Sequence, residues 1–345
     1  MPETRFSSLF RQMILPNIFI FLVLLFSAGS IHAAPKFLKP LLDFEVKESV
    51  SAIAFTADEA LVVVALAKDD GSLLELREVT SGKLIQRFHS PDNPSEELEF
   101  DFRQRLLALS GQKRIELWNL EEIETKTTPA EISRYRIWQQ ETKTSGEMKF
   151  SLKSAKLRWI EGKELKEIPI KPPFIESKVW TGTESGELEN FEFDPDEKIL
   201  ALTEKGNTQI RILQPWQNQI RPSLDYHHFP VADMFFPDKD QIISLDREQN
   251  LAWGEITSRR KGSPARNDAD SFGGEAKKLF QIYKDQVLLY TTANPDRAMI
   301  LDRNGKLYQS LSLSSPGAVA VSPTGRYIMT ADENNRVQLY QSVLH

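Results

Sequence analysis

Cysteine is absent from this chain of 345 residues, and histidine occurs only five times. Without cysteine the protein has no disulfide bond, no thiolate ligand for a metal ion and no attachment point for a c-type haem. A lipid-modified cysteine near the N-terminus is excluded for the same reason. The stability of the fold must therefore come from its packed core.

Long apolar runs are missing after residue 34, so no later segment is predicted to cross a membrane as a helix. Positive charge is not in excess either: the formal net charge is −6, which argues against a protein held on nucleic acid by phosphate contacts. The sequence has no G-x-S-x-G elbow, phosphate-binding loop or dinucleotide-binding fingerprint. His89, His227 and His228 could act as bases, but no motif places a serine beside them. We therefore predict no catalytic residue, no metal site and no cofactor.

The first 34 residues differ in kind from the rest. Arg5 and Arg11 precede an uncharged apolar run over residues 18–28, and small residues follow up to Ala34. This order is typical of a cleavable secretory signal, whose apolar core is shorter than the roughly 20 residues of a membrane-spanning helix. We predict a signal peptide over residues 1–34, with an uncleaved membrane anchor as the alternative. In both cases residues 35–345 lie outside the cytoplasm, in the periplasm or the secreted space.

One pattern recurs seven times after the signal. It consists of a short alternating strand that ends in an aromatic or aliphatic residue, a polar turn and a strongly apolar strand. The residues that end these first strands are Phe55, Phe100, Phe150, Phe193, Phe236, Ile282 and Val321. Their separations of 45, 50, 43, 43, 46 and 39 residues give a period near 44, which is typical of β-propeller blades.

Each copy continues with a third, alternating strand and, where it is legible, a more polar fourth strand such as residues 82–88. Stacking the copies around an axis buries each sheet against the next. The last copy stops after its third strand, whereas residues 41–46 form one strand too many before the first copy. We predict an all-β fold over residues 35–345, a seven-bladed β-propeller of four-stranded antiparallel blades. The N-terminal strand is expected to complete the last blade and close the ring.

Two tryptophans lie near the ends of third strands, in Leu117-Trp118-Asn119 and Leu251-Ala252-Trp253. By period, strand order and these degenerate endings, residues 36–345 resemble WD40-type β-propeller repeats. The resemblance implies the fold and identifies no functional residue. No Gly-His dipeptide occurs, so we do not expect the buried hydrogen-bonded tetrad of that family.

The segment Tyr226, His227, His228 and Phe229 connects the fourth copy to the fifth, on the face where propellers usually engage ligands. Adjacent residues of an extended chain point in opposite directions, so two imidazoles on one metal ion would be awkward. We expect one ring to be packed and the other solvated. Aromatic and amphipathic side chains are enriched in interfaces, so these four residues are candidate contacts for a partner protein.

A polar, glycine-rich segment over residues 257–276 is predicted to be a mobile insertion in the propeller. Its basic residues could dock on an acidic partner or on anionic headgroups, or remain solvated. They are Arg259, Arg260, Lys261 and Arg266. Trp216, in a turn, is a further candidate contact, whereas Trp138 and Trp180 lie in strand-like stretches and are expected to pack within blades.

Three functions are compatible with these features. The leading hypothesis is an exported, non-enzymatic propeller that acts as a scaffold for another protein of the envelope or the secreted space. The alternative is a propeller enzyme, or a protein that binds a small ligand, a metal or a quinone in the central channel. A third, a membrane-tethered assembly factor, requires that the signal is retained.

Overall fold

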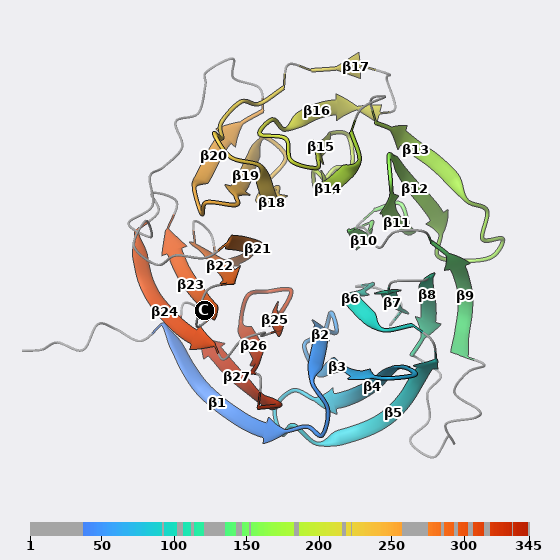
Figure 1. Cartoon of the computed structure of the whole chain (residues 1–345), viewed down its shortest axis with the longest axis vertical. Helices are drawn as coiled ribbons and strands as arrows, with labels where there is room; N and C mark the ends of the chain where they lie inside the picture. The colour runs from blue at the N-terminus through green and yellow to red at the C-terminus, as the bar shows by residue number, and fades with distance from the viewer. Residues whose placement is uncertain are drawn as a thin grey trace, which may run out of the picture. The chain divides into compact units, whose positions relative to one another are not determined.

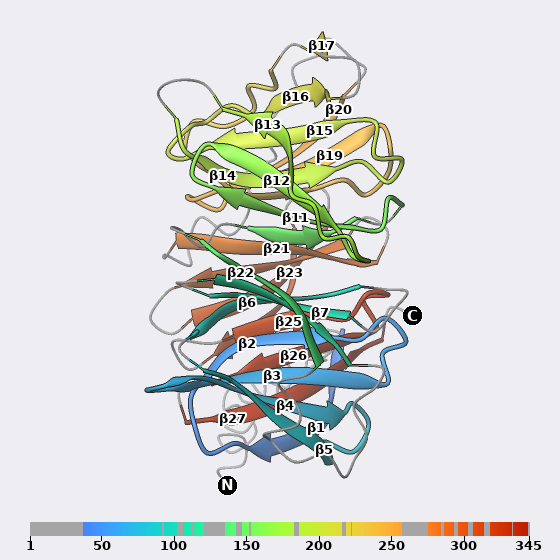
Figure 2. The ribbon, with the colours of Figure 1, turned by 90° about the vertical axis from the view of Figure 1, so that its right-hand side faces the viewer.

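A computed structural model describes residues 37–343, with gaps at residues 92, 102–105, 112–113, 121–134, 143–146, 152, 183–185, 216–218, 222, 257–274, 284–285, 293–295, 303–305, 314–317 and 333. Residues 1–36, with the predicted signal peptide, lie outside this description. The described residues form 27 β-strands in seven antiparallel sheets, which are arranged as a ring (Figure 1). Seen from the side, the sheets stack on one another like the blades of a propeller (Figure 2). The predicted all-β, seven-bladed fold is confirmed.

Within each blade the strands run from the central channel outward. Blade 1 contains β2 (Val50–Phe55), β3 (Leu61–Lys68), β4 (Gly71–Glu78) and β5 (Leu84–Pro91). Blade 2 contains β6 (Ser95–Phe100), β7 (Leu106–Gly111), β8 (Arg114–Asn119) and β9 (Arg136–Glu141). Blade 3 contains β10 (Met148–Phe150), β11 (Lys156–Glu161), β12 (Glu164–Pro169) and β13 (Ser177–Thr181). Blade 4 contains β14 (Leu188–Phe193), β15 (Leu200–Glu204), β16 (Arg211–Gln214) and β17 (Gln219–Ile220).

Blade 5 has three strands among the described residues, and blades 6 and 7 have four each. Blade 5 contains β18 (Val231–Phe235), β19 (Gln241–Asp246) and β20 (Leu251–Glu255). Blade 6 contains β21 (Glu275–Tyr283), β22 (Gln286–Thr292), β23 (Asp296–Asp302) and β24 (Leu307–Leu313). Blade 7 contains β25 (Ala318–Val321), β26 (Tyr327–Ala331), β27 (Arg336–Ser342) and β1 (Leu38–Glu45). The predicted insertion falls almost wholly on residues 257–274, outside the described residues, and its last two residues begin β21.

The first strand closes the ring, as predicted. β1 pairs antiparallel with β27, from Leu38 opposite Ser342 to Glu45 opposite Arg336, and the two strands lie side by side in Figure 1. Leu38 is buried among residues of blades 6 and 7. The strand begins three residues earlier than the predicted range of 41–46 because Leu38 extends the pairing toward the end of β27.

The core consists of separate clusters, most of which lie between two neighbouring blades. One joins blades 1 and 2, where the rings of Phe88 and Trp118 lie 5.4 Å apart. The second strands of the blades, such as β7, are buried along their whole length because they have a sheet on each side. That position explains why the sequence shows continuous apolar runs there. Among the described residues, no helix has the length and apolarity needed to cross a bilayer.

Candidate functional site

The inner strands of the seven blades surround the central channel, and a shared irregularity decides which of their side chains reach it. A β-bulge interrupts the pairing of the inner strand with the second strand in blades 1, 2, 4, 5 and 6. Such a bulge changes the direction of the side chain that follows it. The residues at this post-bulge position, with their register equivalents in blades 3 and 7, are, from blade 1 to blade 7, Ala52, Glu97, Glu147, Asn190, Asp233, Lys278 and Ala318. Side chains alternate along a strand, so the residues two positions later share their side: Ala54, Glu99, Lys149, Glu192, Phe235, Phe280 and Ala320.

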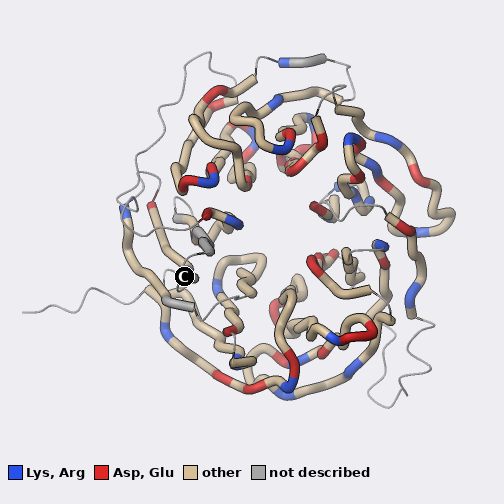
Figure 3. Tube along the Cα trace, viewed as in Figure 1, with Lys and Arg blue, Asp and Glu red and all other residues tan. Residues whose placement is uncertain are grey.

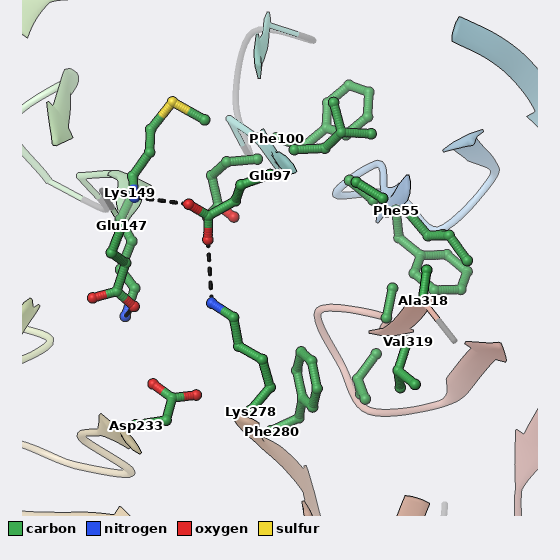
Figure 4. Close-up of a pocket in the computed structure, with 18 of the residues that line it drawn as sticks. Phe55, Glu97, Phe100, Glu147, Lys149, Asp233, Lys278, Phe280, Ala318 and Val319 are labelled. Carbon is green, nitrogen blue, oxygen red and sulfur yellow. Dashed lines mark hydrogen bonds and ion pairs between the residues drawn. The ribbon is translucent and has the colours of Figure 1, made fainter. Parts of the chain in front are cut away.

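Most of these side chains line a cavity of about 430 Å³ at the centre of the ring (Figure 4). Blades 7 and 1 contribute alanine at both positions, and Phe55 and Val319 also line the cavity there. We call these six residues the apolar side of the channel. Blades 2, 3, 5 and 6 contribute the charged lining residues, which Figure 3 marks on the inner strands β6, β10 and β21. Glu192 of blade 4 joins them through its ion pair with Lys149, and we call this group the charged side. The channel therefore has two unlike walls.

Three carboxylates of the charged side connect neighbouring blades. Glu97 accepts a hydrogen bond of 3.0 Å from the backbone N–H of Met148 in the next blade. In the same way Glu147 accepts a bond of 2.7 Å from the N–H of Phe191. Asp233 accepts a bond of 2.8 Å from the N–H of Leu279 in blade 6. The post-bulge carboxylates thus hold the inner strands of successive blades together.

Lys149 lies at the centre of the charged side. Its ammonium lies 2.9 Å from a carboxylate oxygen of Glu147, donates to Glu192, and donates to the carbonyl of Phe191 at 3.2 Å. Burial acts to lower the pKa of Lys149, but the carboxylates of Glu147 and Glu192 outweigh it and raise the pKa well above its ordinary value. Lys149 is therefore charged at any physiological pH, and its three N–H donors are occupied.

Lys278 reaches across the channel. Its ammonium lies 3.2 Å from a carboxylate oxygen of Glu97, although the two residues belong to blades 6 and 2 and blades 7 and 1 stand between them along one side of the ring (Figure 4). Glu97 raises the pKa of Lys278 above its ordinary value, against the opposing effect of burial. The side chain of Lys278 keeps 43% of its surface exposed and that of Glu97 keeps 24%, so the ion pair faces the solvent of the channel.

Glu99 and Glu192 are carboxyls with elevated pKa values. Burial, reinforced by the neighbouring charge of Glu97, raises the pKa of Glu99 to about 8. Burial likewise raises the pKa of Glu192 to about 7, although Lys149 opposes it. Among the described residues, Glu99 makes no hydrogen bond and no ion pair. Five carboxyls therefore face two ammonium groups on the charged side, and one of the five is without a partner.

A second charged cluster lies between blades 3 and 4, away from the channel axis. The buried guanidinium of Arg158 lies 3.1 Å from Glu167 and 3.1 Å from Glu197, and 3.9 Å above the ring of Phe193. Glu197 also accepts hydrogen bonds from the hydroxyl of Ser151 and from a backbone N–H. Burial would raise the pKa of Glu197, but these bonds and Arg158 lower it to about 2. Every charge of this cluster is paired, and we assign it to the packing of the two blades.

His227 is buried in blade 5. Its Nε2 lies 2.7 Å from the hydroxyl of Ser244, and its Nδ1 lies 3.3 Å from a carboxylate oxygen of Asp246. All three side chains are buried, so no substrate can reach the serine hydroxyl. The sequence, which has no Gly-His dipeptide, did not predict this buried group of three side chains. The sequence pattern does not reveal this group because His227 precedes the first strand of blade 5, whereas Ser244 and Asp246 lie in its second strand.

The remaining predicted contact residues divide into two groups. Tyr226 is buried against Gly254, where an added Cβ would lie 2.3 Å from the tyrosine ring, so it and His227 cannot contact a partner directly. This corrects the prediction for those two residues and confirms that one imidazole is packed. His228 is exposed and Phe229 keeps 44% of its surface exposed, so both stay candidates. Trp216, Arg259, Arg260, Lys261 and Arg266 lie outside the described residues. Within the described part of the chain, no group of three or more His, Asp or Glu side chains is arranged to hold a metal ion.

The channel residues were missed by the sequence analysis, although a signal was present. Glu97 and Glu147 each stand three residues before the phenylalanine that ends the inner strand, and Asp233 stands three before Phe236. An alignment of the seven copies on the residues from Phe55 to Val321 that mark the period would have shown a repeated carboxylate. The bulge that turns it into the channel leaves no such mark in the sequence.

The fold and the channel define the class of this protein, a seven-bladed β-propeller with a two-sided central cavity. The chain matches no family model and no curated protein. Its function must therefore be inferred from its own residues.

Proposed function

We propose that this protein is an exported, non-enzymatic scaffold whose rigid ring holds another protein of the cell envelope or the secreted space. The observation that carries this proposal is that backbone hydrogen bonds hold the channel carboxylates in place. Glu97, Glu147 and Asp233 are fixed by backbone N–H groups of the next blade. A surface whose charged groups are already held in place loses little conformational entropy when a partner docks.

The face of the ring on which the inner strands begin supports the proposal further. In an antiparallel blade, the connection from an outer strand to the next inner strand lies on this face. The exposed pair His228 and Phe229 belongs to such a connection, two residues before β18. The post-bulge carboxylates lie near the same ends of their strands. An apolar ring at the rim and charges in the channel therefore share one face, which is a suitable combination for a protein contact.

We further infer a distant relation to WD40-type propellers. The number of blades, the closure by an N-terminal strand and the buried His227, Ser244 and Asp246 of blade 5 support this relation. A tryptophan in each of β8 and β20 occupies the third-strand position on which the sequence resemblance rests.

Crosslinking in the intact cell, followed by affinity capture of the tagged protein, tests the scaffold proposal. The informative variant carries His228→Ala and Phe229→Ala. The matched control is Ile175→Ala, because Ile175 keeps 66% of its surface exposed and lies between a third and a fourth strand, on the opposite face. We expect the wild type and the control to capture the same partner and the double variant to lose it. Equal capture by all three chains would exclude this face, and no crosslinked protein in any of them would contradict the scaffold proposal.

Export is proposed from residues 1–34 and requires its own test. Cell fractionation should find the chain outside the cytoplasm, and N-terminal sequencing of the isolated protein should begin near Pro35. A chain that begins at Met1 and sediments with membranes would instead support the membrane-tethered assembly factor.

The size of the channel cavity favours a second candidate function, the binding of a small ligand. Its volume of about 430 Å³ falls within the roughly 300–1,000 Å³ of small-molecule sites. Thermal unfolding with and without calcium, zinc or a quinone tests this candidate, because a ligand that binds only the folded state raises the melting temperature. A shift that grows with ligand concentration would support it, and an unchanged melting temperature would count against these ligands.

A further inference from the structure

We propose that the channel cavity binds the side chain of a lysine or arginine, presented by a peptide segment of the partner and flanked by an apolar residue. This inference rests on the proposed scaffold function and names the chemistry by which the partner is recognised. It follows from the charges of the channel, from which of them are already paired, and from the apolar side.

The charged side lacks a free cation for an anionic ligand. Lys149 has three acceptors, in Glu147, Glu192 and the carbonyl of Phe191. Lys278 is paired with Glu97. Both channel ammonium groups among the described residues are therefore engaged, and an anion would have to displace a carboxylate to reach either.

The charged side does have a free acceptor. Glu99 lines the cavity and has no hydrogen-bond or ion-pair partner in the described part of the chain. Glu97 and Glu192 add to the negative potential around it, whereas Lys149 and Lys278 oppose it. Burial is the main cause of the elevated pKa of Glu99, and the charge of Glu97 raises it further. A cation placed beside Glu99 would supply the missing partner and keep the carboxyl ionised.

The apolar side indicates what carries the cation. Ala52, Ala54, Ala318 and Ala320 leave room opposite the charged side, and Phe55 and Val319 extend the apolar surface. The methylene groups of a lysine or arginine can pack on such a surface while the charged end reaches a carboxylate. A hydrated inorganic cation would gain nothing from this wall. The cavity runs along the inner strands from Ser51 to Phe55, and these strands begin on the face that carries His228 and Phe229.

The ammonium of Lys278 competes with a ligand cation for the carboxylate of Glu97. This group lies over the channel and pairs with Glu97, and the side chain is 43% exposed. A ligand cation that enters the cavity experiences the repulsion of Lys278 and the attraction of Glu97 and Glu99. Removal of the Lys278 ammonium should therefore strengthen the binding of a cationic side chain, whereas it would weaken the binding of an anionic one.

Fluorescence anisotropy with labelled peptides tests the proposal on the purified exported protein. The probe is a short peptide with one lysine between two leucines. Its matched controls carry norleucine or glutamate in place of the lysine. At pH 8.5 we expect the lysine peptide to bind at least about tenfold more tightly than the norleucine peptide. Its affinity should increase between pH 6 and pH 9, because Glu99 and Glu192 lose their protons in this range.

Two pairs of variants separate the channel from the rest of the surface. Glu99→Gln should weaken binding of the lysine peptide about fivefold or more, and Lys278→Met should strengthen it severalfold. Glu141→Gln, on the outer strand of the same blade as Glu99, and Lys277→Met, the exposed neighbour of Lys278, should leave it unchanged. Circular dichroism of each variant confirms that the fold is retained.

Several outcomes would overturn the inference. Equal affinity for the lysine and norleucine peptides, or weaker binding by Lys278→Met, would show that no cation is recognised. Binding of butylamine alone as tightly as the lysine peptide would show that the site takes a free amine and not a peptide. A partner captured equally by Glu99→Gln and the wild type, but lost by the His228 and Phe229 variant, would contradict the channel inference and leave the scaffold proposal standing. If every variant still captures the partner, both the channel inference and the scaffold proposal are contradicted.

Discussion

The two sides of the channel are held together by different forces. On the apolar side, blades 7 and 1 meet through packed side chains, and their junction is completed by β1, a strand from the other end of the chain. On the charged side, carboxylates that accept backbone hydrogen bonds connect blade 2 to blade 3, blade 3 to blade 4 and blade 5 to blade 6. Packing therefore joins blades 7 and 1, next to the pairing of β1 with β27 that closes the ring, and polar bonds fix the part of the channel that carries charge.

Truncation of a buried side chain in β1, the strand that closes the ring, should have the largest effect on stability. Leu38 of β1 is buried between blades 6 and 7, so Leu38→Ala should lower the free energy of unfolding by about 2–5 kcal/mol. Leu41 of the same strand is 43% exposed, and Leu41→Ala should change it by less than about 0.5 kcal/mol. Urea unfolding followed by circular dichroism measures both. Equal effects of the two variants would show that β1 does not seal the ring by packing.

Removal of a carboxylate bridge on the charged side should have the next largest effect. Glu147→Ala leaves the buried N–H of Phe191 without its acceptor and deprives Lys149 of a counter-ion. We expect a loss of about 1–3 kcal/mol. Glu147→Gln keeps an acceptor oxygen and should cost less, and Glu141→Ala, on an exposed outer strand, should cost almost nothing. If Glu147→Ala unfolds at the same urea concentration as Glu141→Ala, the carboxylate bridges do not stabilise the ring.

The framework of the fold could be predicted from the sequence because its signals are local. The strand-ending residues, such as Phe55 and Phe193, stand at the end of inner strands, and the spare N-terminal strand completes blade 7. An apolar run after a polar turn forms its strand whatever lies elsewhere in the chain.

The channel could not be predicted in the same way because its geometry depends on distant partners. Whether Glu97 faces the channel is decided by a bulge against β7, and its ion pair with Lys278 joins residues 181 positions apart. His227 was expected at the rim, but Ser244 and Asp246 draw it into blade 5. Local patterns determine the strands, whereas the site is determined by how the blades meet.

The pH dependence of stability should differ in sign between a channel carboxyl and a blade-interface carboxyl. The pKa of Glu99 is about 8 in the folded protein against an ordinary value of 4.5, so the folded state holds more protons between these values and loses stability as the pH rises through them. Glu99→Gln should therefore match the wild type near pH 4 and exceed its stability by about 1–2 kcal/mol at pH 9, since channel water screens part of the effect.

Glu197 provides the opposite case. Its pKa of about 2 lies below the ordinary value of 4.5, so its contribution is present above pH 4.5 and is lost as the pH falls toward 2. Glu197→Gln should be less stable than the wild type at pH 7 and approach it near pH 2. Thermal unfolding across the pH range measures both variants. Parallel pH profiles for the two would show that the channel and the blade interface do not differ electrostatically.

The smallest effect on stability is expected where the two sides of the channel meet. The Lys278–Glu97 pair spans the cavity but is partly exposed, and ion pairs in contact with water contribute about 0–1 kcal/mol. Lys278→Met should therefore unfold within about 1 kcal/mol of the wild type, as should Lys277→Met. A cross-channel pair that contributes so little to the fold can be opened by a ligand at little cost, which is what a binding site requires. If Lys278→Met alone lowers the free energy of unfolding by several kcal/mol, the ion pair is a structural interaction. A ligand could then not open it at little cost, and the channel would be closed to ligands by its own ion pair.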